Sequence, residues 1–322
     1  MALLEIRGLN VEYPTLSGIV RAVVDANLEV EGGEWVSIVG ESGSGKSTLA
    51  YSITRLLPPP GRIRSGSILY RGVDLVKLPE RELRKYRGPE IGMIFQDPMT
   101  SLDPVRTIGD QIAEALLEHG IAKDKAEAYS LAGDALEEVG IPRNRLKSYP
   151  HQLSGGQRQR VLIAGAVALN PRILIADEPT TALDVVVQAK IMDLLEELKE
   201  KHDMTIIFIT HDIALAAERS TRIVVMYAGH IMEDAPAEQL VENPLHPYTQ
   251  GLLNATPDLW SDKRIESIPG YPPDLRRPPP GCPFHPRCPR AWGLCRSEKP
   301  ALLDLNGRRV ACHLYRREGA GR

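Results

Sequence analysis

Runs of apolar, β-branched residues alternate along the chain with stretches whose apolar residues recur every three or four positions. The runs Trp35–Val39, Arg172–Ala176 and Thr205–Ile209 are apolar almost throughout, which predicts strands that are buried on both faces. The stretches between them have the periodicity of helices. This alternation predicts an α/β domain with a parallel sheet that helices cover on both sides.

The pattern changes between residues 105 and 140. Apolar residues recur there at helical spacing, first at Ile108, Ile112, Ala115 and Leu116 and then across residues 124–139. No strand candidate interrupts them. We therefore expect an all-helical insertion in the sheet domain, over about residues 98–160.

Composition separates the end of the chain from the rest. Residues 264–322 hold 12 Lys and Arg against 5 Asp and Glu, and 11 of the 26 prolines lie within residues 256–300. All four cysteines lie in the same part. We therefore expect an α/β domain over residues 1–255 and a small Cys- and Pro-rich C-terminal extension over residues 256–322.

Charge and hydropathy exclude several classes of protein. With 322 residues, 43% of them hydrophobic and 25% charged, the chain has enough apolar content for a core. Its net charge of −3 excludes nucleic-acid binding through overall basicity. No apolar run reaches the roughly 18–20 residues that span a bilayer, and the N-terminal residues lack the pattern of a signal peptide. We expect a cytosolic chain.

Residues 40–47 read Gly-Glu-Ser-Gly-Ser-Gly-Lys-Ser and match G-x-x-x-x-G-K-[ST]. The motif follows the strand that ends at Val39 and precedes a predicted helix, as a phosphate-binding loop requires. Its glycines let backbone N–H groups surround phosphates, and the helix N-terminus adds partial positive charge. Lys46 would reach the β- and γ-phosphates, and the Ser47 hydroxyl would bind Mg²⁺. The residues predicted to bind nucleotide here are Gly40, Ser42, Gly43, Gly45, Lys46, Ser47 and Thr48.

Two adjacent acids follow the second predicted strand. Asp177 and Glu178 come directly after Ala176, at a strand end where burying carboxylates is costly without a cation. A nucleotide-bound Mg²⁺ supplies that cation, so Asp177 is predicted to orient the metal. Glu178 is one residue further on and is predicted to act as the general base toward the attacking water.

A second anion-binding surface is predicted at Leu153–Gln157, which reads Leu-Ser-Gly-Gly-Gln. A helix that begins with Ser-Gly-Gly presents free backbone N–H groups that no side chain obstructs. One nucleotide does not need two such surfaces from one chain, whereas two chains that face each other head-to-tail would use both. The segment resembles the signature sequence of ATP-binding cassette (ABC) ATPases.

Other residues follow in the order of that family. Gln96 resembles the loop glutamine that senses Mg²⁺ and the γ-phosphate, and His211 resembles the switch histidine. Tyr13 is placed to stack on adenine, and it fits equally well as a strand aromatic. The resemblance implies a P-loop NTPase cassette. The site residues it implies are the catalytic groups Glu178, His211 and Gln96, the Mg²⁺ ligands Ser47, Gln96 and Asp177, and, toward the ATP of a partner, Ser154, Gly155, Gly156 and Gln157.

Three further segments resemble the ATPase subunits of dipeptide and oligopeptide importers: Gln96–Pro104, Asn243–Thr249 and the tail from Pro280 to Leu314. Nickel importers of the same group carry related ATPases. The resemblance implies an ATP-hydrolysing subunit on the cytoplasmic face of the membrane. Its partners would be a second ATPase subunit, identical or paralogous, and two permease subunits. An extracytoplasmic binding protein would act indirectly, and no nucleic acid is expected.

A rival from another class is a soluble ABC ATPase that acts on nucleic acid or ribosomes. Such proteins usually carry two cassettes or a long coiled-coil insertion, whereas this chain has one cassette and a short insertion. A scaffold that binds ATP without hydrolysing it is a second rival. The presence of Lys46, Glu178 and His211 argues against the scaffold.

The four cysteines have the spacing C-x₅-C-x₆-C-x₁₆-C, at Cys282, Cys288, Cys295 and Cys312. This spacing differs from the C-x₂-C pairs of zinc ribbons and from the runs of ferredoxins. A small proline-rich segment usually needs a metal or a covalent cross-link, and arginines flank these cysteines. Tails of this kind in peptide-importer ATPases resemble iron–sulfur sites. We expect a [4Fe–4S] cluster with a structural role, with zinc or free thiols as alternatives.

Overall fold

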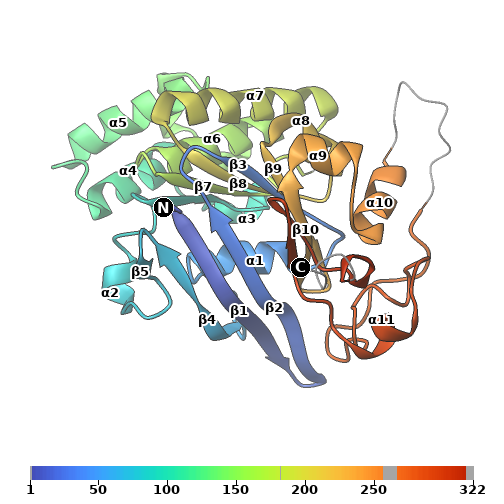
Figure 1. The fold of residues 1–322 in the computed structure, drawn as a ribbon. Helices are drawn as coiled ribbons and strands as arrows, with labels where there is room; N and C mark the ends of the chain where they lie inside the picture. The colour runs from blue at the N-terminus through green and yellow to red at the C-terminus, as the bar shows by residue number, and fades with distance from the viewer. Residues whose placement is uncertain (1, 182, 257–266, 317–322) are drawn as a thin grey trace. The chain divides into compact units, whose positions relative to one another are not determined.

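The computed structural model describes residues 2–181, 183–256 and 267–316, which form two compact units (Figure 1). Unit 1 contains the residues up to Lys77 and those from Ile209 onward, and unit 2 is Leu78–Phe208. The predicted extension over residues 256–322 includes residues 257–266 and 317–322, which lie outside the described residues. Its predicted boundary near residue 255 stays a prediction.

Unit 1 contains an antiparallel sheet near the N-terminus, with the strand order β2-β1-β4-β5 (Figure 1). Its strands are β1 (Leu4–Thr15), β2 (Gly18–Val30), β4 (Arg62–Tyr70) and β5 (Val73–Asp74). Residues of β1 and β2 pair from Leu4 with Val30 to Thr15 with Gly18. Leu4, Ile6 and Leu9 are buried, while Arg7 between them is exposed, so the sheet has one apolar face.

A second set of strands in unit 1 carries the phosphate-binding motif. Its order is β11-β12-β10-β9-β3, where β3 and β9 are parallel and the other pairs are antiparallel. The strands are β3 (Trp35–Val39), β9 (Arg222–Tyr227), β10 (His230–Pro236), β11 (Leu303–Leu305) and β12 (Arg308–Val310). The helices of unit 1 are α1 (Lys46–Ile53), α8 (Ile213–Arg219), α9 (Ala237–Glu242), α10 (Pro247–Asn254) and α11 (Gly293–Ser297), with a 3₁₀ turn at His313–Tyr315.

Buried ion pairs attach the C-terminal part to β10. Arg308 donates to fully buried Glu233, and Arg309 donates to Asp234, which also accepts from Arg222 on β9. Two buried carboxylates are costly without such partners, so these arginines hold β12 on the sheet edge. Removing one partner would leave a buried charge uncompensated.

The C-terminal part also shares a hydrophobic core with the sheet. Phe284, Cys282 and Cys295 belong to one buried cluster with Tyr227 of β9 and Tyr248 of α10. Phe284 packs edge-on against Tyr227, with ring centroids 5.2 Å apart. A part of the predicted extension around Cys282, Phe284 and Cys295 is therefore buried against the sheet of unit 1.

Unit 2 is mainly helical. Its elements are α2 (Glu80–Leu83), β6 (Ile91–Ile94), α3 (Pro98–Ser101), α4 (Ile108–Glu118), α5 (Lys125–Glu138), 3₁₀ turns at Arg143–Lys147 and Pro150–Gln152, α6 (Gly155–Val167), β7 (Ile173–Asp177), α7 (Val185–His202) and β8 (Thr205–Thr210), whose last two residues belong to unit 1. Strands β6 and β7 are parallel. Thr107 and Asp124 accept hydrogen bonds from backbone N–H groups at the starts of α4 and α5.

The α/β fold class is confirmed, and the three predicted strands correspond to β3, β7 and β8. Every regular element between Pro98 and Val167 is helical, and the predicted limits of 98 and 160 for the insertion stay predictions. Within residues 2–181, 183–256 and 267–316, no helix has the length and apolar character needed to cross a membrane.

Candidate nucleotide-binding site

The phosphate-binding motif forms a tight loop between β3 and α1. Gly40, Gly43 and Gly45 have φ values of 154°, 75° and 103°, which L side chains rarely adopt. A Cβ on Gly40 would lie 2.1 Å from the Met226 carbonyl oxygen, and one on Gly45 would lie 2.2 Å from that of Ala22. The loop can therefore follow this path only with glycine at these positions.

Lys46 begins α1 and lies inside the loop. Its Nζ donates to the carbonyl oxygens of Gly40 (2.8 Å) and Glu41 (3.0 Å), and only 4% of the residue is exposed. The ammonium is thus held at the loop, where it would meet a bound phosphate. The buried Ser44 hydroxyl has no hydrogen-bond partner. A glycine loop with a fixed cation and a free buried hydroxyl fits a triphosphate.

Four other predicted residues of unit 1 lie on or beside three elements. Ser47 and Thr48 are in the first turn of α1, and the Tyr13 hydroxyl on β1 is 3.5 Å from the Thr48 hydroxyl. Tyr13 therefore lies beside the start of α1, as an adenine-stacking residue would. His211 follows β8 and is exposed, next to Asp212, which accepts hydrogen bonds at the start of α8.

In unit 2, the predicted general base and the predicted sensing glutamine are in contact. Gln96 Nε2 donates to Glu178 Oε2 (3.1 Å), and Thr181 Oγ1 donates to the same oxygen (3.0 Å). Asp177, at the end of β7, is fully buried. Glu178 has φ of 44°, a conformation that is unfavourable for a residue other than glycine. Backbone strain of this kind is often found at functional sites.

The segment predicted to face a partner's ATP forms the N-terminus of α6. Ser154 Oγ accepts from the Gln157 N–H (3.3 Å), and Gln157 Oε1 accepts from the Ser154 N–H (3.0 Å). This reciprocal capping fixes both side chains. A Cβ on Gly156 would lie 2.8 Å from Val187 on α7, so glycine permits this packing. Ser154 and Gly155 are exposed, as contact with a second molecule requires.

The comparisons with known proteins decide the family. The family model described as "ABC transporter" matches residues 23–181, and that described as "Oligopeptide/dipeptide transporter, C-terminal region" matches residues 232–295. The dipeptide transport ATP-binding protein DppD of Escherichia coli is 48% identical over 326 residues, which cover 100% of this chain and 99% of the relative. The chain belongs to the ABC transporter ATPase family.

Further relatives have similar names. The oligopeptide transport ATP-binding protein OppD of Salmonella typhimurium is 49% identical, over 96% of this chain and 93% of the relative. Among solved structures, the dimeric ABC cassette MJ0796 has a TM-score of 0.65 at 33% identity, over 73% of this chain and 98% of that one. The same cassette in a post-hydrolysis dimer, bound to ADP and Pi, has a TM-score of 0.66 at 33% identity, over 73% and 98%.

The cysteines of this ABC ATPase are gathered but form no recognisable single-ion site. Cys282, Cys295 and Cys312 are buried, and all four cysteines are free thiols. Burial raises the pKa of Cys282 to about 12, and its three fellow cysteines add to the shift. Across the described residues, no group of three or more His, Cys, Asp or Glu is arranged to hold a metal ion. The structure therefore gives no support to the predicted metal site.

The residues predicted from the sequence to form the site do not include Glu41, which contacts the C-terminal part. Glu41 is the second residue of the phosphate-binding loop, and its N–H donates to the Tyr248 hydroxyl (2.9 Å). Its carboxylate accepts two hydrogen bonds from Arg287 (2.7 and 2.9 Å). Tyr248 lies in the Asn243–Thr249 segment, which served only as a mark of the peptide-importer branch. The resemblance of that segment to peptide-importer ATPases was the only sequence feature that drew attention to Tyr248. It does not indicate that Tyr248 contacts the phosphate-binding loop.

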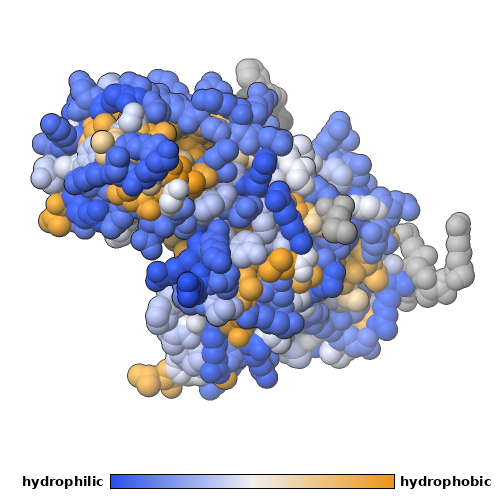
Figure 2. Space-filling model, turned by 90° about the vertical axis from the view of Figure 1, so that its left-hand side faces the viewer, coloured by the Kyte–Doolittle hydropathy of each residue, from blue (hydrophilic) through white to orange (hydrophobic). Residues whose placement is uncertain are grey.

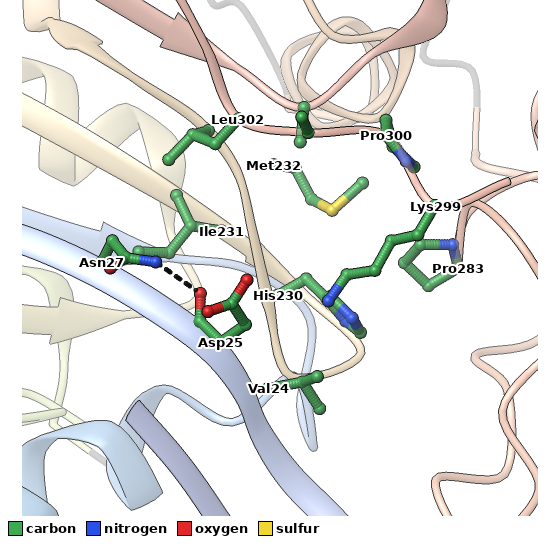
Figure 3. A pocket seen from close by; sticks show the side chains of 12 residues that line it. Val24, Asp25, Asn27, His230, Ile231, Met232, Pro283, Lys299, Pro300 and Leu302 are labelled. Atoms are coloured by element: carbon green, nitrogen blue, oxygen red, sulfur yellow. Dashed lines mark hydrogen bonds between the residues drawn. The ribbon is translucent and has the colours of Figure 1, made fainter. Parts of the chain in front are cut away.

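Unit 1 contains a separate cavity of about 400 Å³ between β2, β10 and the C-terminal part (Figure 3). Lys299 reaches across it toward Asp25 and His230, and the apolar Met232 also lines the cavity. Burial lowers the pKa of His230 to about 4, so this imidazole is neutral near pH 7. None of the residues predicted to bind nucleotide lines this cavity, so it is distinct from the phosphate-binding loop.

Proposed function

We propose that this ABC ATPase hydrolyses ATP to power the uptake of di- or oligopeptides by a membrane importer. The observation that carries the proposal is the joint match of one chain to an ABC transporter model and to the C-terminal region of oligopeptide/dipeptide transporters. Relatives that match over nearly the whole chain are named for dipeptide and oligopeptide transport. These names favour peptide over nickel as the cargo.

Two chains build each ATP site in this proposal. By the resemblance to the family, one chain supplies Lys46, Ser47, Gln96, Asp177, Glu178 and His211, and Ser154–Gln157 of a partner completes the site. The exposed capped start of α6 supports the partner's role, as does the dimeric state of the cassette MJ0796. The partner is a second copy or a paralogous subunit.

When they are bound, ATP supplies the phosphate that reacts and Mg²⁺ neutralises part of the negative charge on the phosphates. Lys46 and the loop N–H groups hold the phosphates, and the Ser47 hydroxyl and Asp177 carboxylate would hold the metal. Glu178 accepts the proton of the attacking water, with its carboxylate positioned by Gln96 and Thr181.

The helical part of unit 2 is proposed to contact the permease, on the cytoplasmic face of the membrane. Val105 and Ile121, on either side of α4, are 79% and 47% exposed. Figure 2 shows apolar side chains gathered, among hydrophilic ones, at the height of α4 and α5. Exposed apolar areas of this kind often mark protein contacts. Nucleotide-driven closure would then act on the membrane subunits.

Co-purification tests this function. A tagged copy produced with its genomic neighbours and extracted from membranes in mild detergent should bring down two permease subunits. The complex, reconstituted with its binding protein, should take up a labelled dipeptide only when ATP is present. Ribosomes or RNA bound to the soluble chain, with no permease in the membrane fraction, would instead support the nucleic-acid rival.

We also propose that Cys282, Cys288, Cys295 and Cys312 hold a [4Fe–4S] cluster. The Cys282 N–H donates to the Cys295 carbonyl oxygen (2.9 Å), and Cys288 packs against the hydrophobic cluster that contains both residues. A four-iron cluster is larger than one ion, so it needs its thiolates farther apart than tetrahedral zinc does. The proposal therefore depends on the resemblance of this Cys-rich tail to iron–sulfur sites, and zinc remains the alternative that the experiment must exclude.

Protein purified without oxygen is expected to be brown, to absorb near about 400 nm and to contain about four iron atoms per chain. Cys295→Ser should abolish the colour, whereas Ser297→Ala, an exposed hydroxyl two residues away, should not. Iron and zinc analysis gives the measurement. Colourless anaerobic protein with one zinc per chain contradicts the cluster, and loss of colour only in air does not.

A further inference from the structure

Arg287 connects the C-terminal part to the phosphate-binding loop through its guanidinium group. Its five N–H groups all donate: two to the Glu41 carboxylate (2.7 and 2.9 Å), one to the Tyr227 hydroxyl (3.3 Å), one to the Pro269 carbonyl (2.8 Å) and one to the Ile268 carbonyl (3.4 Å). Only 5% of its side chain is exposed. The guanidinium also lies 5.7 Å from the centre of the Tyr227 ring.

Glu41 is an unexpected residue for a loop that binds phosphates. Its own carbonyl accepts from Lys46 Nζ, so its backbone touches the cation that would meet the nucleotide. The carboxylate is 26% exposed, too little to rely on water alone for screening. A negative charge held there would repel a triphosphate. Arg287 supplies the opposite charge in a bidentate pair, the strongest geometry for neutralising a carboxylate.

The Asn243–Thr249 segment, which resembles that of peptide-importer ATPases, contacts the backbone of Glu41. His246 Nδ1 accepts from the Tyr248 N–H at the start of α10, and burial lowers the pKa of His246 to about 3, which keeps the ring neutral. The N–H groups of Leu245 and His246 donate to buried Glu233. These contacts fix Tyr248, whose hydroxyl accepts from the Glu41 N–H.

We propose that Arg287 is a positioning residue for ATP binding: it neutralises the Glu41 carboxylate and, together with Tyr248, which accepts from the Glu41 N–H, holds the phosphate-binding loop in the form that accepts a triphosphate. The C-terminal part is then a working component of the ATP site. The inference rests on the proposed binding of ATP by the loop.

The test measures the affinity for fluorescent mant-ATP and mant-ADP by titration. Arg287→Gln is expected to weaken ATP binding roughly tenfold, because one uncompensated charge then faces the phosphates. The loss should be smaller for ADP, which carries less charge. Arg287→Lys keeps the charge without the fork and should lose less. Arg316→Gln breaks an exposed arginine–carboxylate pair of the same C-terminal part and should change neither affinity.

The double variant Glu41→Gln/Arg287→Gln separates charge compensation from simple support of the fold. It should recover most of the lost ATP affinity, because no carboxylate is left to compensate. If Arg287→Gln does not fold, the ATP affinities of the double variant and of Glu41→Gln are compared instead. Equal affinities mean that Arg287 matters for ATP binding only while the Glu41 carboxylate is present. Unchanged ATP affinity in Arg287→Gln, or a double variant as weak as the single one, overturns the proposal. Wild-type protein that fails to bind mant-ATP would instead refute the proposed function.

Discussion

Replacing Glu178 with glutamine is expected to leave Mg·ATP binding intact and to slow hydrolysis by about 10²- to 10⁴-fold. Glutamine keeps a carbonyl oxygen that can still accept from Gln96 and Thr181, which contact one carboxylate oxygen of Glu178 at 3.1 and 3.0 Å. The local geometry should therefore survive, while the group that takes a proton from water is lost. Phosphate release measures the rate, and mant-ATP titration measures the binding.

A matched control is Glu197→Gln, which changes an exposed carboxylate of the same unit on α7. It should hydrolyse ATP at the wild-type rate. Because ATP persists in the Glu178 variant, its ATP-bound dimer should accumulate and be visible by light scattering. Turnover near wild type in Glu178→Gln would remove this residue from the catalytic role, whatever the dimer does.

The sequence was informative wherever the chemistry lies in one continuous segment. The loop at residues 40–47 needs its glycines because of two close approaches of carbonyl oxygens, and it lies between a strand and a helix that were both predicted. The buried strands were predicted because a sheet covered on both faces leaves an unbroken apolar run. Local pattern was sufficient for these features.

Contacts between distant segments could not be derived from local pattern. Arg287 and Glu41 are 246 residues apart, and nothing near either one indicates the other. Gln96 and Glu178 are 82 residues apart and were linked only by family resemblance. The strands β11 and β12 have three residues each, too short for a periodicity to be recognised, and buried ion pairs hold β12 in place.

The strained backbone of Glu178 also has no sequence signal. Its φ of 44° is imposed by the fold at the end of β7, where the next residue is Pro179. A substitution at Glu178 therefore reports on the catalytic role of the carboxylate only if the new residue adopts the positive φ as readily as glutamate does. Glutamine has the same length and branching, which is why it is preferable to alanine at this position.

Lys46→Ala is expected to weaken ATP binding by roughly tenfold to a hundredfold, the range for losing hydrogen bonds of about 1.5–3 kcal/mol from a charged group. Lys46 has a double function in the loop, because its ammonium bonds two loop carbonyls and would meet the β- and γ-phosphates. Alanine removes both functions, so the affinity for ATP should fall more than that for ADP. Titration with mant-nucleotides measures both.

The matched control for this lysine is Lys190→Ala, which removes an exposed ammonium from α7 and should leave both affinities unchanged.

Lys46→Ala and Glu178→Gln should lose ATPase activity for different reasons. The lysine variant should lose activity mainly through nucleotide binding, so a high ATP concentration recovers part of the rate. The glutamate variant should stay slow at any concentration, because its defect is in the chemical step. Unchanged ATP affinity in Lys46→Ala would count against the assignment of the loop, since Lys46 is the ammonium that the loop carbonyls of Gly40 and Glu41 hold.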